Sequence, residues 1–168
     1  DNDGWQDLLV GSHSGYYPQN TLFKNLGDGT FLDVTDAAGI TDPFNGDGTA
    51  VADLDNDGWL DVLFCRLDEE CVLYRNVDGG AFEVIADNAG LFNQAEYPNW
   101  TLSTGDVDGD GFLDVYMGNG RANHPAHDHL FLNGGNDHHH LFVSVEGRLG
   151  DRSAIGAKIE VVTGDVTP

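Results

Sequence analysis

The chain has 168 residues, with 29 acidic side chains against 7 basic ones and a formal net charge of −22 at pH 7. Such an excess of negative charge argues against nucleic acids and anionic membrane surfaces as partners. No apolar run reaches the length of a membrane-spanning helix and no signal peptide is recognised, so we expect no membrane insertion.

The chain opens on a short acidic segment, Asp1–Asp7, that recurs twice in a longer form. The two full copies, Asp53–Asp61 and Asp106–Asp114, share the pattern D-x-D-x-D-G-x-x-D with an aromatic residue after the glycine. In the opening copy, Asp1 corresponds to the third position of the pattern, so the residue at position one lies upstream of the printed sequence. We therefore expect an incomplete first site in a piece of a longer protein.

The spacing of these carboxylates suits a calcium ion. Ca²⁺ takes six to eight oxygen ligands, and the glycine permits the tight turn that brings the carboxylates together. Unit charges about 4 Å apart repel by roughly 4 kcal/mol at an effective dielectric constant of 20, so each loop is expected to fold around its metal. The predicted ligands are the carboxylates at positions one, three, five and nine and the backbone carbonyl at position seven: Asp53, Asp55, Asp57, Trp59 and Asp61; Asp106, Asp108, Asp110, Phe112 and Asp114; and, in the incomplete copy, Asp1, Asp3, Trp5 and Asp7.

These loops differ from an EF-hand. An EF-hand requires a glutamate at position twelve and a helix on each side, whereas position twelve is Phe64 in one copy and Met117 in the other. Short apolar runs rich in strand-forming residues follow each copy, which predicts strands. Ordinary acidic surface turns would have a similar composition, but the repetition with the same flanks favours a metal loop.

Short strands are predicted throughout the first 133 residues, separated by glycine-rich turns. Asn25, Asn76 and Asn133 each end a strand and lead into a turn, a place that suits the tolerance of asparagine for left-handed backbone. The two complete acidic loops begin 53 residues apart, and each period holds about four strands, which is the size of one β-propeller blade. The expected strands are residues 8–10, 22–25, 30–35, 49–52, 60–64, 73–76, 81–85, 101–104, 113–117 and 130–133.

The acidic loops and the segment Asn25–Thr35, which reads N-L-G-D-G-T-F-L-D-V-T, resemble FG-GAP/VCBS repeats, the blades of integrin-α-like propellers. This resemblance implies an all-β fold of four-stranded antiparallel blades with calcium-binding loops. Three blades alone rarely close a ring, so a partial propeller is expected. The repeats are predicted at residues 1–52, 53–105 and 106–136. The turn degrades at Val77–Ala81 in the second repeat and runs into histidines in the third.

The character of the chain changes at His138. Residues 139–147 and 153–162 are predicted to form two alternating strands joined by a polar turn. This part resembles the start of the ASPIC/UnbV segment that follows such repeats in the cartilage acidic protein family. We therefore treat residues 137–168 as a separate ASPIC/UnbV-like β segment.

The histidines present an alternative site. His124, His127 and His129 surround Asp128, and three further histidines occupy residues 138–140. Imidazoles and a carboxylate could bind zinc, copper or iron, which would make the His124–His140 region the centre of an enzyme or a sensor. ASPIC/UnbV-like segments commonly begin with histidines, however, and adjacent histidines on a strand would point to opposite faces.

The two cysteines, Cys65 and Cys71, are six residues apart and each borders an apolar run. We expect them to face each other across a hairpin and to form a disulfide, with reduced buried thiols as the alternative. The aromatic residues at loop position seven are expected to pack between blades.

The function implied is calcium-dependent structural or adhesive work outside the cell or at its surface. No nucleophile motif is found, so no enzyme is expected. The expected partner is an unknown protein or glycan ligand, and exposed blade edges offer a surface for self-assembly.

Overall fold

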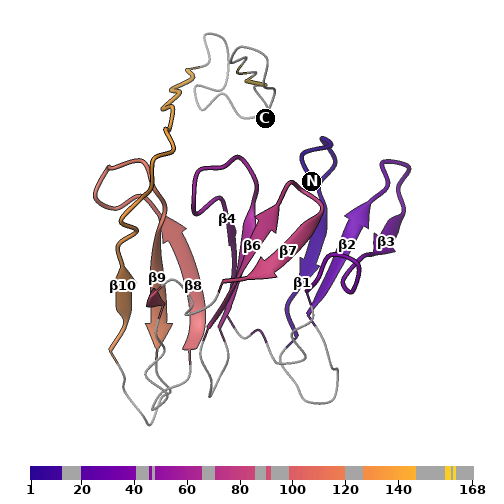
Figure 1. Ribbon diagram of the computed structural model, residues 1–168, viewed down its shortest axis with the longest axis horizontal. Coiled ribbons are helices and arrows are strands. Elements are labelled where there is room, and N and C mark those ends of the chain that lie inside the picture. Colours follow the sequence, from indigo (N-terminus) through magenta and orange to yellow (C-terminus); the bar gives the residue numbers. More distant parts are fainter. Residues whose placement is uncertain are drawn as a thin grey trace.

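The computed structural model describes residues 1–12, 20–40, 46, 48–65, 71–85, 90–91, 99–119, 127–146, 158–159 and 161. These described residues form ten β-strands in three antiparallel sheets that stand side by side (Figure 1). In each sheet, strands that follow one another in the chain are neighbours. The all-β, partial-propeller fold predicted from the sequence is confirmed, and within the described parts of the chain no sheet closes on itself.

The three sheets follow one another along the chain, and each of the second and third begins with the strand that precedes its acidic loop. The first sheet contains β1 (Leu8–Val10), β2 (Thr21–Asn25) and β3 (Phe31–Asp33). The second contains β4 (Gly48–Ala52), β5 (Asp61–Cys65), β6 (Val72–Val77) and β7 (Ala81–Val84). The third contains β8 (Asn99–Gly105), β9 (Asp114–Asn119) and β10 (His129–Phe131).

The second sheet is the complete four-stranded blade. Its acidic loop joins β4 to β5, where Ala52 pairs with Asp61. In the third sheet the acidic loop joins β8 to β9 in the same way, and Gly105 pairs with Asp114. The incomplete acidic segment precedes β1, which pairs with β2 as β5 pairs with β6. All three acidic segments therefore lie at one end of the sheets, the upper end in Figure 1.

Alternation along β5 builds the core between the sheets. Leu63 and Cys65 belong to a buried cluster that includes Leu102 and Met117 of the third sheet. The other face of β5 belongs to a second buried cluster, against which Leu22 of the first sheet packs. Successive side chains of a strand point to opposite faces, so the fully buried β5 joins both neighbours of the central blade.

The disulfide predicted from the sequence is confirmed. Cys65 at the end of β5 is bonded to Cys71 just before β6, with a Cα–Cα distance of 4.0 Å. Both cysteines are fully buried in the cluster between the second and third sheets. The bond therefore joins the end of β5 to the residue before β6 within the core.

Residues 139–146 differ from the prediction, because the structure assigns no strand to them. Leu141 and Phe142 are 67% and 75% exposed, so the apolar positions of this segment are not packed. An alternating pattern indicates which face a strand would bury, but a strand also requires a neighbouring backbone that pairs with it. Most of the second predicted strand, residues 153–162, lies outside the described residues.

Candidate metal-binding loops

Three acidic loops occupy equivalent positions in the three sheets. We name them loop 1 (Asp1–Asp7), loop 2 (Asp53–Asp61) and loop 3 (Asp106–Asp114). Loops 2 and 3 each connect the first two strands of a sheet, so their last residue begins a strand and is held in register. That final aspartate is buried in both loops, with 3% of Asp61 and 1% of Asp114 exposed.

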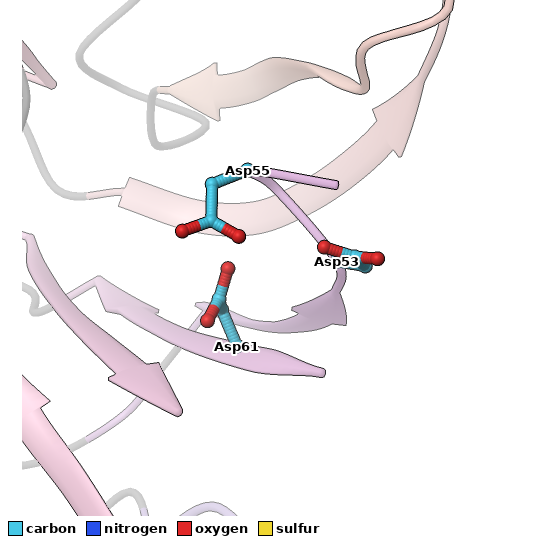
Figure 2. Close-up of side chains that lie close together, drawn as sticks. All are labelled: Asp53, Asp55 and Asp61. Atoms are coloured by element: carbon cyan, nitrogen blue, oxygen red, sulfur yellow. The ribbon is translucent and has the colours of Figure 1, made fainter. Parts of the chain in front are cut away.

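Each complete loop gathers three carboxylates into one small space. In loop 2, oxygen atoms of Asp53, Asp55 and Asp61 all lie within 4.8 Å of one another. Figure 2 shows the carboxylates of Asp55 and Asp61 directed toward each other, with Asp53 to one side. In loop 3, Asp106, Asp108 and Asp114 form the same group. Positions one, three and nine of the pattern thus converge twice, on two different sheets.

The carboxylates at position five do not belong to these groups. Instead, Asp57 Oδ1 accepts a hydrogen bond from the backbone N–H of Trp59 at 2.9 Å. Asp110 Oδ1 does the same for Phe112, also at 2.9 Å. Each loop therefore brings together three of its four predicted carboxylates, while the fourth shapes the turn.

Backbone N–H groups of the loop orient the first aspartate. Asp53 accepts hydrogen bonds from Asp57 N at 3.2 Å and Gly58 N at 3.0 Å. This turn requires left-handed backbone at positions four and six, with φ of +56° at Asn56 and +93° at Gly58. Asparagine and glycine are the residues that adopt such angles at low cost, which explains the glycine that ends each D-x-D-x-D run.

The buried end of loop 2 is an unfavourable place for a negative charge. The pKa of Asp61 is raised to about 6, and burial is the largest cause. The N–H groups of Asn76 and Leu54 lower this pKa, and the nearby charges of Asp55 and Asp57 raise it. Burial also raises the pKa of Asp53, the first carboxylate of the loop. A cation among these groups would offset this cost.

Asn25, Asn76 and Asn133 each shape the turn that follows them, because their Oδ1 atoms accept the N–H of a glycine in that turn. They also have a role that was not predicted. None of Asn25, Asn76 and Asn133 has a positive φ. The backbone N–H of Asn76 donates to Asp61 Oδ1 at 2.9 Å, and its side-chain amide donates to the carbonyl of Leu60 at 3.1 Å. Asn25 and Asn133 make the equivalent bonds in loops 1 and 3. Each asparagine therefore holds position nine of its loop.

The aromatic residues at position seven pack within their own repeat. A Cβ atom placed on Gly79 would lie 2.3 Å from the ring of Trp59, so the ring lies directly against the β6–β7 turn. Trp5 lies against Gly27, and Phe112 against Gly135, in the same manner. Each ring thus contacts the glycine turn of its own repeat, and packing of these rings between blades stays a prediction.

A basic side chain contacts the carboxylates of loop 1. Lys24 of β2 forms ion pairs with Oδ2 of Asp1 and, at 3.5 Å, with Oδ2 of Asp3. Asp7 Oδ1 accepts a hydrogen bond from Asn25 N at 2.8 Å. The lysine ammonium therefore lies on the carboxylates at positions three and five.

An arginine occupies the corresponding place in loop 2. Arg75 Nε lies 2.8 Å from Asp55 Oδ2, and one terminal nitrogen lies 3.5 Å from Asp57 Oδ2. Lys24 and Arg75 each stand one residue before the asparagine that contacts position nine of their loop, and Leu132 stands there in the third repeat. The recurring units L-F-K-N, L-Y-R-N and L-F-L-N show this position in the sequence. That its side chain contacts the acidic loop follows only from the strand pairing.

The histidine region holds no comparable group within the described residues. His127, His129 and residues 138–140 are absent from every cluster there that could hold a metal, and His124 lies outside the described residues. Asp128 instead accepts hydrogen bonds from the Tyr116 hydroxyl at 2.6 Å and from Asn119 N at 2.9 Å. These bonds lower the pKa of Asp128 and fix it as a structural link between β9 and β10.

Neighbouring loops are joined by hydrogen bonds. The amide of Asn2 in loop 1 donates to the carbonyl of Gly58 in loop 2 at 2.9 Å. The amide of Asn56 in loop 2 donates to the carbonyl of Gly111 in loop 3 at 3.0 Å. In the other direction, Asn133 donates to the carbonyl of Leu54 at 2.7 Å. The loops thus form a continuous polar layer across the three sheets.

Comparison with known proteins agrees with this repeated design. The family model of the FG-GAP-like repeat matches residues 1–64 and 53–117. Cartilage acidic protein 1 of Xenopus tropicalis is 28% identical over 153 residues, which cover 90% of this chain and 23% of that protein. Cartilage acidic protein 1 of Homo sapiens is 32% identical over 114 residues, which cover 67% of this chain and 17% of that protein.

Both resemblances indicated by the sequence, to the repeats and to relatives of cartilage acidic protein, are confirmed. The chain spans less than a quarter of the length of the curated relatives it matches. None of the described residues form an apolar helix of membrane-spanning length.

Proposed function

The chain belongs to the FG-GAP-like repeat family, and on this premise we propose that it is a calcium-stabilised stretch of β-propeller blades. The observation that carries the proposal is the double convergence of three carboxylates within 4.8 Å, in loop 2 and again in loop 3. Convergent carboxylates without histidine or cysteine suit a hard cation, and calcium accepts such flexible oxygen shells.

The residues present fit a calcium ion chemically. Asp53, Asp55 and Asp61 would hold the ion in loop 2, and Asp106, Asp108 and Asp114 would hold it in loop 3. The ion supplies the positive charge that allows buried carboxylates to remain ionised at neutral pH. The raised pKa of Asp61, at about 6, supports this role, since burial penalises its charge in the absence of a metal.

The wider role follows from the fold and its relatives. We propose an extracellular or cell-surface interaction protein, without catalytic activity, whose blades present a surface to a protein or glycan ligand. The buried Cys65–Cys71 disulfide supports an oxidising compartment. The relatives named cartilage acidic protein 1 agree with a structural setting. Self-association through exposed blade edges is a further proposal, and a monodisperse monomer in sedimentation velocity would argue against it.

Calcium removal tests the proposal directly. A ligand at 100 times its Kd stabilises a protein by about 2.7 kcal/mol per site, and each kcal/mol shifts Tm by roughly 2–4 °C in a chain of this size. We therefore expect EGTA to lower the melting temperature of the 168-residue chain by roughly 10 °C or more, and added calcium to restore it. Calorimetric titration should give about two ions per chain. An unchanged melting temperature in EGTA would refute the calcium role.

A further inference from the structure

We propose that Arg75 is a built-in counter-cation that competes with calcium for loop 2, so that loop 2 binds the ion more weakly than loop 3. This inference rests on the proposed function, because it concerns the relative affinity of the two calcium loops. It assigns loop 3 as the site that stays occupied and loop 2 as the site that empties first when calcium falls.

The arginine contacts the oxygen atoms that the loop backbone leaves available. Asp55 Oδ1 accepts the N–H of Asp57 at 3.2 Å, and Asp57 Oδ1 accepts the N–H of Trp59 at 2.9 Å. The Oδ2 atoms of both aspartates instead face Arg75. The guanidinium therefore sits on the one free oxygen of each of these two carboxylates.

The same arrangement recurs in loop 1. Lys24 on β2 contacts the Oδ2 atoms of Asp1 and Asp3, which occupy pattern positions three and five, as do Asp55 and Asp57. Two different basic side chains, on two different sheets, thus contact equivalent pairs of oxygen atoms. Their recurrence indicates that this place in the blade receives a cation when the sequence supplies one.

Loop 3 lacks this cation. Leu132 replaces the basic residue, and its side chain is 60% exposed. Asp108 Oδ1 and Asp110 Oδ1 accept backbone N–H groups as their counterparts in loop 2 do. Within the described part of the chain, no basic side chain is paired with Asp108 or Asp110. Among these residues, the negative charge of loop 3 therefore has no counterpart of Arg75 to offset it.

Arg75 is held loosely enough to yield to calcium. Its Nε is buried and lies 2.8 Å from Asp55 Oδ2, but without the alignment of a hydrogen bond. The side chain lines a cavity of about 790 Å³ beside the loop, which leaves room for movement. Glu83, its cross-strand partner on β7, lies 3.9 Å from another terminal nitrogen and offers an alternative carboxylate.

The positive charge of Arg75 is expected to lower the calcium affinity of loop 2. A bound guanidinium repels an incoming divalent ion, and its release from Asp55 costs an ion pair. Removal of Arg75 therefore favours calcium through both effects. Because Arg75 is partly exposed, the ion pair is weak, and we expect a change in affinity of roughly 5- to 10-fold.

A reciprocal exchange tests this inference. Asp114→Asn removes the calcium site of loop 3, so that loop 2 is titrated alone. Asp61→Asn removes the calcium site of loop 2, so that loop 3 is titrated alone. In the D114N background, Arg75→Leu should raise calcium affinity roughly 5- to 10-fold, whereas Arg75→Lys should leave it nearly unchanged. In the D61N background, Leu132→Arg should lower the affinity of loop 3 by a similar factor. Calcium affinity is measured by competition with a chromophoric chelator, and folding by circular dichroism.

The outcomes separate this inference from the function on which it rests. An R75L affinity within twofold of the parent, or a lower one, would overturn the role of Arg75. Tighter binding by loop 2 than by loop 3 in the two single-loop backgrounds would overturn the ranking. If D61N and D114N each leave the number of bound ions unchanged, it is the calcium function itself that fails.

Discussion

Loops 2 and 3 share one pattern and one geometry, yet they differ in what contacts them from outside. In both, carboxylates at positions one, three and nine converge within 4.8 Å. Loop 2 carries Arg75 on its free oxygens, whereas the third repeat has Leu132 at the equivalent position of its sequence. The nine-residue pattern therefore specifies the ligand cluster. Residues on the following strands determine how strongly that cluster requires an added cation.

The two loops also differ in their links to the neighbouring sheet. Loop 2 donates a side-chain amide from Asn56 to loop 3 and accepts amides from Asn133 and Asn136 at the carbonyls of Leu54 and Asp55. Loop 3 has Gly109 at the position of Asn56 and so has no side-chain donor there. Loop 2 is therefore tied into its neighbour from both directions.

The largest expected effect comes from removal of the buried position-nine aspartates. Asp114→Asn should abolish one calcium site and lower stability in calcium by about 4 kcal/mol, since both the ion and a buried acceptor are lost. Asp61→Asn should cost about 1 kcal/mol less, because Arg75 already offsets part of the charge in loop 2. Urea unfolding in saturating calcium measures both. Equal losses would show that the two loops depend on calcium to the same degree.

The ligand cluster was predictable because its residues are close in sequence. Nine consecutive positions contain all the carboxylates, and the flanking strand patterns indicated where each loop begins and ends. The role of Arg75 was not predictable in this way, since its contact with Asp55 depends on the pairing of β5 with β6. Likewise, Asn76 shapes the turn that follows it by accepting the N–H of Gly79, as expected, but its second contact, with Asp61, depends on strand pairing.

The strand predicted at residues 139–147 is a case in which the sequence pattern was not sufficient. Its alternating pattern is clear, but Phe142 is 75% exposed and no neighbouring strand pairs with the segment among the described residues. The local sequence pattern describes the preference of one segment for a strand, whereas a sheet also requires a second strand whose backbone pairs with it. The pattern was therefore sufficient for β5, which has neighbours on both sides, and insufficient for this segment.

The second prediction concerns the glycine turns that receive the aromatic ring of each loop. Gly79 has a φ of +73°, and an added Cβ would lie 2.3 Å from the Trp59 ring. Gly79→Ala should therefore cost roughly 2–4 kcal/mol through backbone strain and collision with the ring. The neighbouring substitution Gly80→Ala is the matched control, because nothing lies within 4 Å of its added Cβ.

Chemical unfolding of both variants checks this expectation, and Gly135→Ala extends it to the third repeat. An added Cβ on Gly135 would lie 2.7 Å from the Phe112 ring, at a φ of +68°. A smaller loss than for Gly79→Ala is expected, because the smaller ring approaches less closely. If Gly79→Ala proves no more harmful than Gly80→Ala, the ring does not support the loop from the turn.

The smallest expected effect comes from the amide that joins loop 2 to loop 3. Asn56→Gly keeps the left-handed backbone, since φ is +56° there, and makes loop 2 resemble loop 3 at this position. It removes the hydrogen bond to Gly111 O, so we expect a loss of about 1 kcal/mol in urea unfolding with calcium present. The reverse change, Gly109→Asn, should alter stability by less than about 0.5 kcal/mol, because a solvent-exposed side chain gains little. A neutral result for Asn56→Gly would mean that the buried cluster containing Leu63 and Met117, with the hydrogen bonds from Asn133 and Asn136, holds the second and third sheets together without this amide. In that case the difference between asparagine and glycine at this position would have no structural consequence, and Arg75 would remain as the feature that distinguishes the two loops.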